Sequence, residues 1–326
     1  MITTYSRENG KTVVQEMFTV EDFPSDVVWV DMVSPTADEM DLVESLLHIE
    51  LPNKGEVWKN HVLNRLYVED GVAYMTAALI NKINTPYPET VAVTFIVGKR
   101  FFLTMREISP TSFKIFSERI MKQGGLFETP SNLAEGLFEE MIIRVAHNSE
   151  QLVDTLDELS HNIFSTDVFE EKKQRNATAV MKNALKSLGA AVDLNSKINE
   201  SLHTFLRMLH FFKQWSQAHP AKDPSIDILI SDTQALVQQT AFLSDKATFQ
   251  LDATLGMINV EQNLIIKIFS IVTVFFLPAT LVSSIYGMNF GHMPELHWVW
   301  GYPFALMLMV ICAVVPHVYF RRKGWM

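Results

Sequence analysis

Residues 268–286 read IFSIVTVFFLPATLVSSIY, and this uncharged run decides the fold. As a helix it is long enough to cross a bilayer core of about 30 Å. A second such run, WVWGYPFALMLMVICAVVPHVYF, covers residues 298–320. Because only residues 287–297 join the two runs, we predict a membrane hairpin whose two ends lie on the same side. A buried hairpin in a soluble protein is the alternative, which two adjacent runs of this length disfavour.

Positive charges around the hairpin predict its orientation. Arg321, Arg322 and Lys323 follow the second run directly, Lys267 precedes the first, and the link contains no Lys or Arg. In membrane proteins the cytoplasmic flanks carry the excess of Lys and Arg. We therefore expect an integral protein of the cell (inner) membrane, in contact with lipid, with both termini in the cytoplasm.

The composition limits the function classes. The 326-residue chain is 48% hydrophobic and has a formal net charge of -10. Surfaces that bind nucleic acid are basic, so we expect no nucleic-acid partner. Clustered carboxylates raise the local cation concentration, but an acidic surface also serves solubility alone, and composition leaves both interpretations open. The single cysteine, Cys312, excludes an internal disulfide framework and a Cys-rich zinc site.

The part before the hairpin contains two kinds of pattern. At first strands and helices alternate: Val27–Val30 reads as a strand, Ser34-Pro35-Thr36 opens a helix, and Asp70-Gly71 and Gly98-Lys99 each mark a β-hairpin. From residue 131 onward the pattern is helical, with helices over about 131–164 and 168–215 and a break at 218–224. Another helix runs from about 225 to 286, roughly 90 Å at 1.5 Å per residue.

These patterns predict an α/β N-terminal cytoplasmic domain, followed by long stalk helices and two C-terminal transmembrane helices. Helices as long as the one from residue 225 belong to stalks or coiled coils. The expected boundaries are 1–130 for the α/β domain, 131–262 for the helical stalk, 263–288 for the first span, 289–298 for the external loop, 299–320 for the second span and 321–326 for a basic cytoplasmic tail.

The first span contains a row of mostly polar or small residues. Its members follow one another in steps of three and four, the heptad rhythm that keeps a seam facing neighbouring helices. Two interpretations remain open: small and hydroxyl residues allow close helix packing, or the row faces water and lines a pore. A pore requires several copies around an axis, because two spans cannot enclose one. The row consists of Asn263, Ile266, Ser270, Thr273, Leu277, Thr280, Ser284 and Gly287.

The outer end of the first span carries Gly287-Met288-Asn289, followed by Met293-Pro294-Glu295-Leu296 and by Gly301-Tyr302-Pro303 at the start of the second span. With these motifs the chain resembles the CorA family of magnesium channels. The resemblance implies a homopentameric funnel with Gly287, Met288 and Asn289 as the selectivity filter. It also implies that Asn263, Leu277, Thr280 and Ser284 of the row line the pore. The chain departs from the family at Gly291-His292, where relatives often carry an acidic residue, so external cation attraction rests mainly on Glu295.

The chemistry of Mg²⁺ suits such a pore. Mg²⁺ dehydrates reluctantly, and a ring of Asn289 carbonyls can accept hydrogen bonds from its water shell. The first span has no carboxylate that would trap the ion. A divalent ion moving inward gains roughly 4.6 kcal/mol per 100 mV, so no ATP is required. We expect passage of hydrated Mg²⁺, and of Co²⁺ or Ni²⁺ as further candidates, with Ile266 and Leu277 as possible constrictions.

The resemblance also implies that cytoplasmic Mg²⁺ closes the channel at subunit interfaces. Asp227, Asp232 and Asp252 are the candidate regulatory ligands, and a solvated helix face is the alternative for each. Mg²⁺ is thus expected as transported ion and regulator, with no organic cofactor.

Two other functions remain candidates. One is a Zn²⁺ transporter of the ZntB type, since His292 and His297 lie in the external loop. The other is a membrane-anchored sensor or interaction protein without ion flux. The α/β region has no nucleophile elbow, HExxH pair or Gly-rich phosphate loop, so we expect no enzymatic activity.

Overall fold

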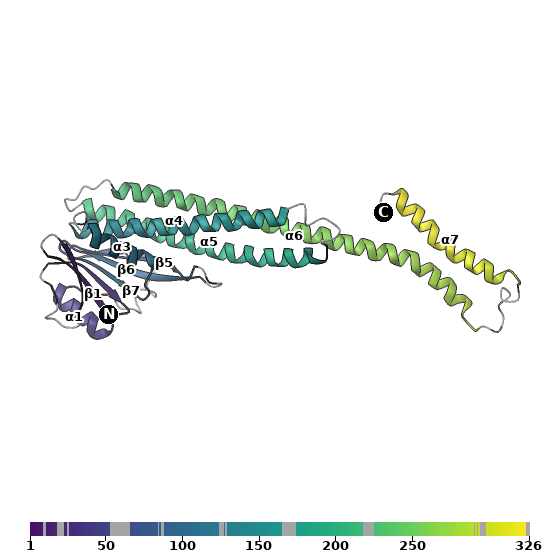
Figure 1. The fold of residues 1–326 in the computed structure, drawn as a ribbon, viewed down its shortest axis with the longest axis horizontal. Helices are drawn as coiled ribbons and strands as arrows, with labels where there is room; N and C mark the ends of the chain where they lie inside the picture. Colours follow the sequence, from purple (N-terminus) through teal and green to yellow (C-terminus); the bar gives the residue numbers. More distant parts are fainter. Residues whose placement is uncertain are drawn as a thin grey trace. The chain divides into compact units, whose positions relative to one another are not determined.

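The chain forms two compact units, Met1–Leu251 and Asp252–Met326, in a computed structural model. The structure describes residues 1–8, 11–17, 23–24, 26–52, 66–83, 85, 88–123, 127, 129–164, 174–217, 225–289, 291, 293 and 298–323. The α/β fold followed by long helices and two C-terminal apolar helices is confirmed (Figure 1).

The first unit contains a seven-stranded sheet with the order β2-β1-β3-β7-β6-β5-β4. Neighbouring strands are antiparallel, except that β3 and β7 run parallel. β3 and β7 lie inside the strand order and are almost wholly buried, as parallel strands usually are. The strands are β1 (Ile2–Glu8), β2 (Lys11–Met17), β3 (Val27–Val33), β4 (Leu66–Glu69), β5 (Val72–Asn81), β6 (Glu89–Val97) and β7 (Phe102–Arg106).

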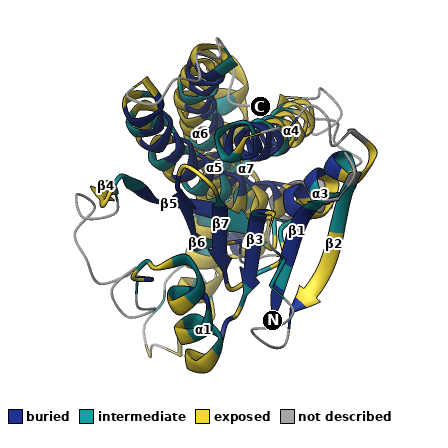
Figure 2. Ribbon diagram, turned by 90° about the vertical axis from the view of Figure 1, so that its left-hand side faces the viewer, coloured by how far each residue is buried: buried dark blue, intermediate teal, exposed yellow. Residues whose placement is uncertain are grey.

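Both predicted hairpins are confirmed. Between β4 and β5, Asp70 and Gly71 have φ angles of 49° and 80°, the left-handed conformation that a two-residue turn of this kind requires. Between β6 and β7, the Gly98 N–H donates to the Phe101 carbonyl at 2.9 Å. The sequence pattern does not predict β1 and β2, because β1 is rich in polar residues. Thr4 and Ser6 are nevertheless buried, because their side chains point to faces of the sheet that other elements cover (Figure 2).

Helices cover both faces of the sheet (Figure 2). On one face lies α1 (Ala37–Leu47), which begins as predicted: Thr36 and Glu39 form a reciprocal capping box. Its Val43 packs into a core with Met32 and Leu103. On the other face lie α3 (Thr111–Gln123), α4 (Pro130–Phe164) and α5 (Gln174–Gln217).

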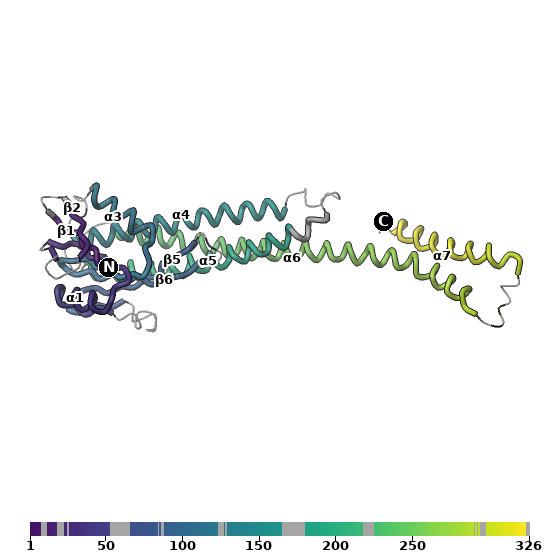
Figure 3. Tube along the Cα trace, turned by 60° about the horizontal axis from the view of Figure 1, so that its bottom comes forward, coloured from purple at the N-terminus to yellow at the C-terminus, as the bar shows by residue number. Residues whose placement is uncertain are grey.

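The long helices share one core with the sheet. Within the region predicted as a helical stalk, Phe138 of α4 and Phe212 of α5 pack edge to face at 5.5 Å inside the cluster that also holds Phe95 of β6. Farther along, Leu152, Leu188 and Leu243 join α4, α5 and α6 (Ser225–Tyr286) in a second cluster. Figure 3 shows these three helices running alongside one another in the first unit. The helices thus bury one apolar side within a single chain, while Ile143, Phe242 and Phe249 remain exposed on other sides.

The second unit contains the end of α6 and α7 (Gly301–Arg322). As predicted, α6 is one uninterrupted helix of 62 residues, with Pro278 inside it. The second helix starts slightly later than the predicted span, because residues 298–300 form a turn in which the Gly301 N–H donates to the Trp298 carbonyl at 2.9 Å. The most apolar windows of α6 and α7 have mean hydropathies of 2.3 and 2.0, and almost nothing in them is buried. Exposed surface this apolar is compatible with lipid rather than water.

A buried ion pair fixes the centre of the sheet. The Arg106 guanidinium of β7 donates to both carboxylate oxygens of Asp31 on β3, at 3.0 and 2.6 Å. Thr104 also donates to Asp31 at 2.7 Å, and Trp29 donates to Thr104 at 3.0 Å. The network thus satisfies the buried charges with hydrogen bonds, as a low-dielectric site requires.

Asp31→Asn removes the carboxylate charge and leaves Arg106 buried without a counter-ion. Because this leaves an uncompensated charge, we expect the free energy of unfolding to fall by about 3–5 kcal/mol. Thermal unfolding of the full-length protein in detergent measures the change as a lower melting temperature. Asp193→Asn is the matched control: its exposed carboxylate pairs with Lys197 at 2.8 Å, and its loss should cost less than about 1 kcal/mol. Equal melting temperatures for the two variants would contradict the prediction.

Candidate functional site

The candidate site is the row of α6 residues from Asn263 to Gly287, called the 263–287 row below. All eight members are exposed in the chain, including the apolar Ile266 (61%) and Leu277 (67%). Half-buried residues lie on another side of the helix, the covered row, and at 100° per residue the two rows are roughly 150° apart. The covered row consists of Lys267, Ile271, Phe275, Pro278, Ala279, Val282 and Tyr286.

The covered row is the side of α6 that contacts α7. The rings of Phe275 and His317 on α7 lie 5.8 Å apart. The 263–287 row is therefore not packed against the second helix of its own chain. It remains available to water or to further copies of the protein.

The hydroxyl groups of the row have a defined orientation. Ser270, Thr273 and Thr280 each donate to the backbone carbonyl four residues earlier, at 2.8, 2.8 and 2.7 Å. Each hydroxyl has one proton to donate and two lone pairs to accept with. Since the proton is used inside the helix, the oxygens are left as acceptors. A row of acceptors suits the water shell of a cation, whose hydrogen atoms point outward.

The site is not built to hold a bare metal ion. The row contains no carboxylate, thiol or imidazole. Among the described residues of the whole chain, no three His, Cys, Asp or Glu side chains gather where they could hold a metal. A small divalent ion demands several close oxygen ligands before it gives up water.

The row ends at the C-terminal end of α6. There the Gly287 N–H donates to the Ser283 carbonyl at 3.0 Å, and the Met288 N–H donates to the Ile285 carbonyl at 3.2 Å. A Cβ on Gly287 would lie only 3.2 Å from the Ser283 carbonyl oxygen, so glycine permits this close approach. The last helical turn has no basic residue, and the partial negative charge of a helix C-terminus favours cations. Exposed Asn289 follows directly.

The three acidic candidates on α6 do not come together within one chain. Asp227, Asp232 and Asp252 are all exposed, and Asp227 pairs with Lys213 of α5 at 2.5 Å. Asp227 lies in the first unit, whereas Asp252 is the first residue of the second. The sequence pattern did not indicate Lys213, because an ion pair between two helices has no signature in either one.

Several predicted residues lie outside the described part of the chain. They include Glu295, His292 and His297 of the external loop. His317 is a residue that the sequence analysis missed. A search for ionisable residues inside apolar spans would have found it, since such residues are rare in membrane helices.

The fold and the row define an integral membrane protein that carries a cation-compatible row on one of its two spanning helices. A family model described as CorA-like Mg²⁺ transporter protein matches residues 24–322, and the chain belongs to this family.

Individual relatives agree with this assignment. The magnesium transport protein CorA of Haemophilus ducreyi is 30% identical over 326 residues, covering 100% of both chains. The protein of the same name from Escherichia coli is 29% identical, also over 100% of both. The solved CorA magnesium transporter of Methanocaldococcus jannaschii has the same fold, with a TM-score of 0.74 at 18% identity, over 100% of this chain and 99% of that one.

Thr273→Cys tests whether water reaches the 263–287 row, in a Cys312→Ala background that removes the native thiol. We expect a water-soluble, positively charged methanethiosulfonate to modify it at least about tenfold faster than Val272→Cys, because only an ionised thiol reacts. Val272 is the matched control, since it is 46% exposed and lies at the same depth on another side of α6. Labelling rates in reconstituted vesicles measure the difference. A faster reaction at position 272 would refute water access to the row.

Proposed function

We propose that the protein is a channel that conducts hydrated Mg²⁺ down its electrochemical gradient. The observation that carries the proposal is the exposed 263–287 row, in which the hydroxyl oxygens of Ser270, Thr273 and Thr280 are left as acceptors on the mostly apolar part of α6. Membership of a family of Mg²⁺ transporters supports the choice of ion. Co²⁺ and Ni²⁺ form similar hexahydrated ions and are further candidate substrates.

The channel is a homopentamer in this proposal. Two helices cannot enclose a water-filled path, so identical α6 helices must surround an axis. The covered row already contacts α7, which leaves the 263–287 row to face that axis. Gly287, Met288 and Asn289 then form rings at the outer mouth, where the Asn289 carbonyls accept hydrogen bonds from the ion's water shell. Glu295 attracts cations on the outside.

Two energetic features fit passive conduction. A divalent ion gains roughly 4.6 kcal/mol per 100 mV on moving inward, so the membrane potential drives uptake. The apolar rings of Ile266 and Leu277 give the row two constrictions that close by expelling water. The remaining acceptors bind a hydrated ion weakly, and weak binding allows release.

The orientation of the protein in the membrane follows from the basic residues beside its two apolar helices. Arg321, Arg322 and Lys323 lie at the end of α7, and Lys267 lies on α6 where the apolar run begins. With both ends of the hairpin in the cytoplasm, the first unit also lies there, and the protein belongs to the cell (inner) membrane.

Cytoplasmic Mg²⁺ regulates the channel in this proposal. Asp227, Asp232 and Asp252 are exposed and separate from one another in a single chain. When several copies of α6 surround an axis, the exposed carboxylates of one copy are available to the neighbouring copy. A divalent ion shared across that interface would favour one packing of the subunits over another.

Asn289→Ala should lower Mg²⁺ uptake by reconstituted protein at least about tenfold, because it removes the ring of carbonyl acceptors at the mouth. Uptake of Mg²⁺ and of Zn²⁺ into proteoliposomes under an imposed potential is the measurement. Asn259→Ala on the cytoplasmic part of α6 is the control for loss of an exposed amide and should keep most of the flux. Preference for Zn²⁺ would favour the ZntB-type alternative, and no flux of either ion would favour a membrane-anchored sensor.

Replacing Asp227, Asp232 and Asp252 together by Ala should leave the channel conducting at millimolar internal Mg²⁺, because the regulatory ligands are gone. Wild-type flux should fall under the same conditions. Asp245→Ala, a further exposed carboxylate on α6, should keep the wild-type response. The assignment fails if the triple variant still closes at the same internal Mg²⁺ concentration as wild type.

A further inference from the structure

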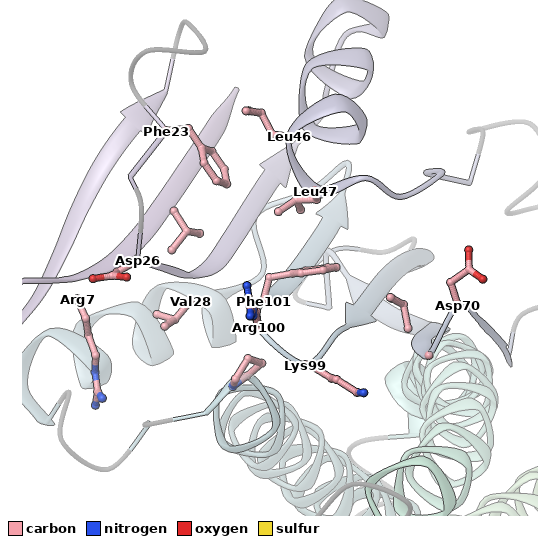
Figure 4. A pocket seen from close by; sticks show the side chains of 14 residues that line it. Arg7, Phe23, Asp26, Val28, Leu46, Leu47, Asp70, Lys99, Arg100 and Phe101 are labelled. Carbon is pink, nitrogen blue, oxygen red and sulfur yellow. The ribbon is translucent and has the colours of Figure 1, made fainter.

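A feature not used by the proposed function is a cavity of about 880 Å³ in the first unit (Figure 4). It lies at one end of the strands, beside the β6–β7 turn, the β4–β5 turn and the start of β3. The end of α1 and the first residue of α4 complete its surroundings. Its volume falls within the range of about 300–1,000 Å³ that is usual for small-molecule sites.

Basic side chains gather in this cavity although the protein is acidic. Lys99 and Arg100 occupy the two exposed positions of the β6–β7 turn, and Arg7 of β1 is a third cation in the lining. Neither Lys99 nor Arg100 has an ion pair with any residue that the structure describes. In a chain of net charge -10, two adjacent cations without a counter-ion in the described structure form a local site for an anion.

The first turn of α4 adds to this attraction. Pro130 begins this 35-residue helix and also lines the cavity. Pro130 has no backbone N–H, and the N–H groups of Asn132 and Leu133 donate to the Thr129 hydroxyl and carbonyl at 3.2 and 3.1 Å. This helix end therefore adds only its partial positive charge, which favours an anion. The helix end and the turn Lys99–Arg100 thus contribute charge of the same sign from different elements.

The opposite wall of the cavity is apolar. Phe23, Leu46 and Leu47 line it, and Figure 4 shows Phe101 in the middle between this wall and the basic turn. Phe101 is held in place, because its ring packs against Gly98, where a Cβ would approach it to 2.7 Å. An aromatic and aliphatic wall accepts a flat, apolar ring system.

Two carboxylates complete the lining. Asp26 lies beside Arg7, whose backbone N–H donates to the Asp26 carbonyl at 3.2 Å, and Asp70 lies in the β4–β5 turn. In the close-up, Asp26 and Asp70 occupy opposite ends of the cavity and the basic turn lies between them. These carboxylates would repel phosphate but accept hydrogen bonds from sugar hydroxyls, as acidic residues do at ribose.

We propose that this cavity binds a nucleoside polyphosphate. The phosphates lie on the Lys99–Arg100 turn near the start of α4, the base lies against the apolar wall, and the ribose hydroxyls donate to a carboxylate. A ligand with phosphate alone would leave the apolar wall and both carboxylates unused. Binding requires only the first unit, so this proposal can be tested independently of ion conduction.

Isothermal titration calorimetry of the full-length protein in detergent, with EDTA present, tests the site with ATP, adenosine and pyrophosphate. Wild type should bind one ATP per chain, and pyrophosphate and adenosine should each bind at least about fivefold more weakly. Lys99→Ala combined with Arg100→Ala should weaken ATP binding at least about tenfold, because two charged contacts are lost. Phe23→Ala should weaken ATP binding but leave pyrophosphate binding unchanged.

The matched control is Lys182→Ala combined with Lys186→Ala, which removes two exposed lysines of α5 away from the cavity and should leave ATP affinity within about twofold. Lys99→Ala alone, expected to lose about threefold, replaces the double variant if that variant melts earlier than wild type. The proposal is wrong if wild type shows no saturable ATP binding or if the turn variants bind ATP like the control. Pyrophosphate binding as tightly as ATP would overturn the role of the apolar wall.

Discussion

The hydrogen bonding of the α6 backbone is the constraint on which the membrane part of the structure depends. In lipid no water is available to pair exposed N–H and C=O groups, so a spanning segment must satisfy them internally. A helix does this residue by residue, and α6 continues as one helix through its apolar region despite Pro278. The same local bonding leaves the side chains of α6 free to differ from one side of the helix to another.

That freedom separates the 263–287 row from the covered row. Close contact with α7 uses residues such as Phe275, whereas the hydroxyl oxygens of Ser270, Thr273 and Thr280 lie elsewhere on the helix. Their protons bond to carbonyls of the preceding turn, so the helix both satisfies these groups in lipid and presents their lone pairs outward. One arrangement therefore meets the demand of the bilayer and, in the proposed channel, that of a hydrated cation.

The first unit depends instead on the packing of its sheet. Its sheet is covered on both faces, and the buried Asp31–Arg106 pair joins its two central strands with charged hydrogen bonds. A sheet held in this way fixes the positions of the turns that connect its strands. The β4–β5 turn, the β6–β7 turn and the start of β3 are far apart along the chain, yet they meet around one cavity that combines basic, apolar and acidic groups.

The sequence by itself determined the hairpin of apolar helices, the long α6, the two β-turns and the members of the 263–287 row, because each rests on local periodicity or turn chemistry. Motifs at the outer end of α6 also indicated the family. Only the tertiary structure decided that α4 and α5 pack on the sheet, that β1 is a buried strand, which side of α6 meets α7, and that Arg106 reaches Asp31, 75 residues away. Such contacts depend on strand order and on the path of the chain. The periodicity of the residues that make the contacts reveals neither of these.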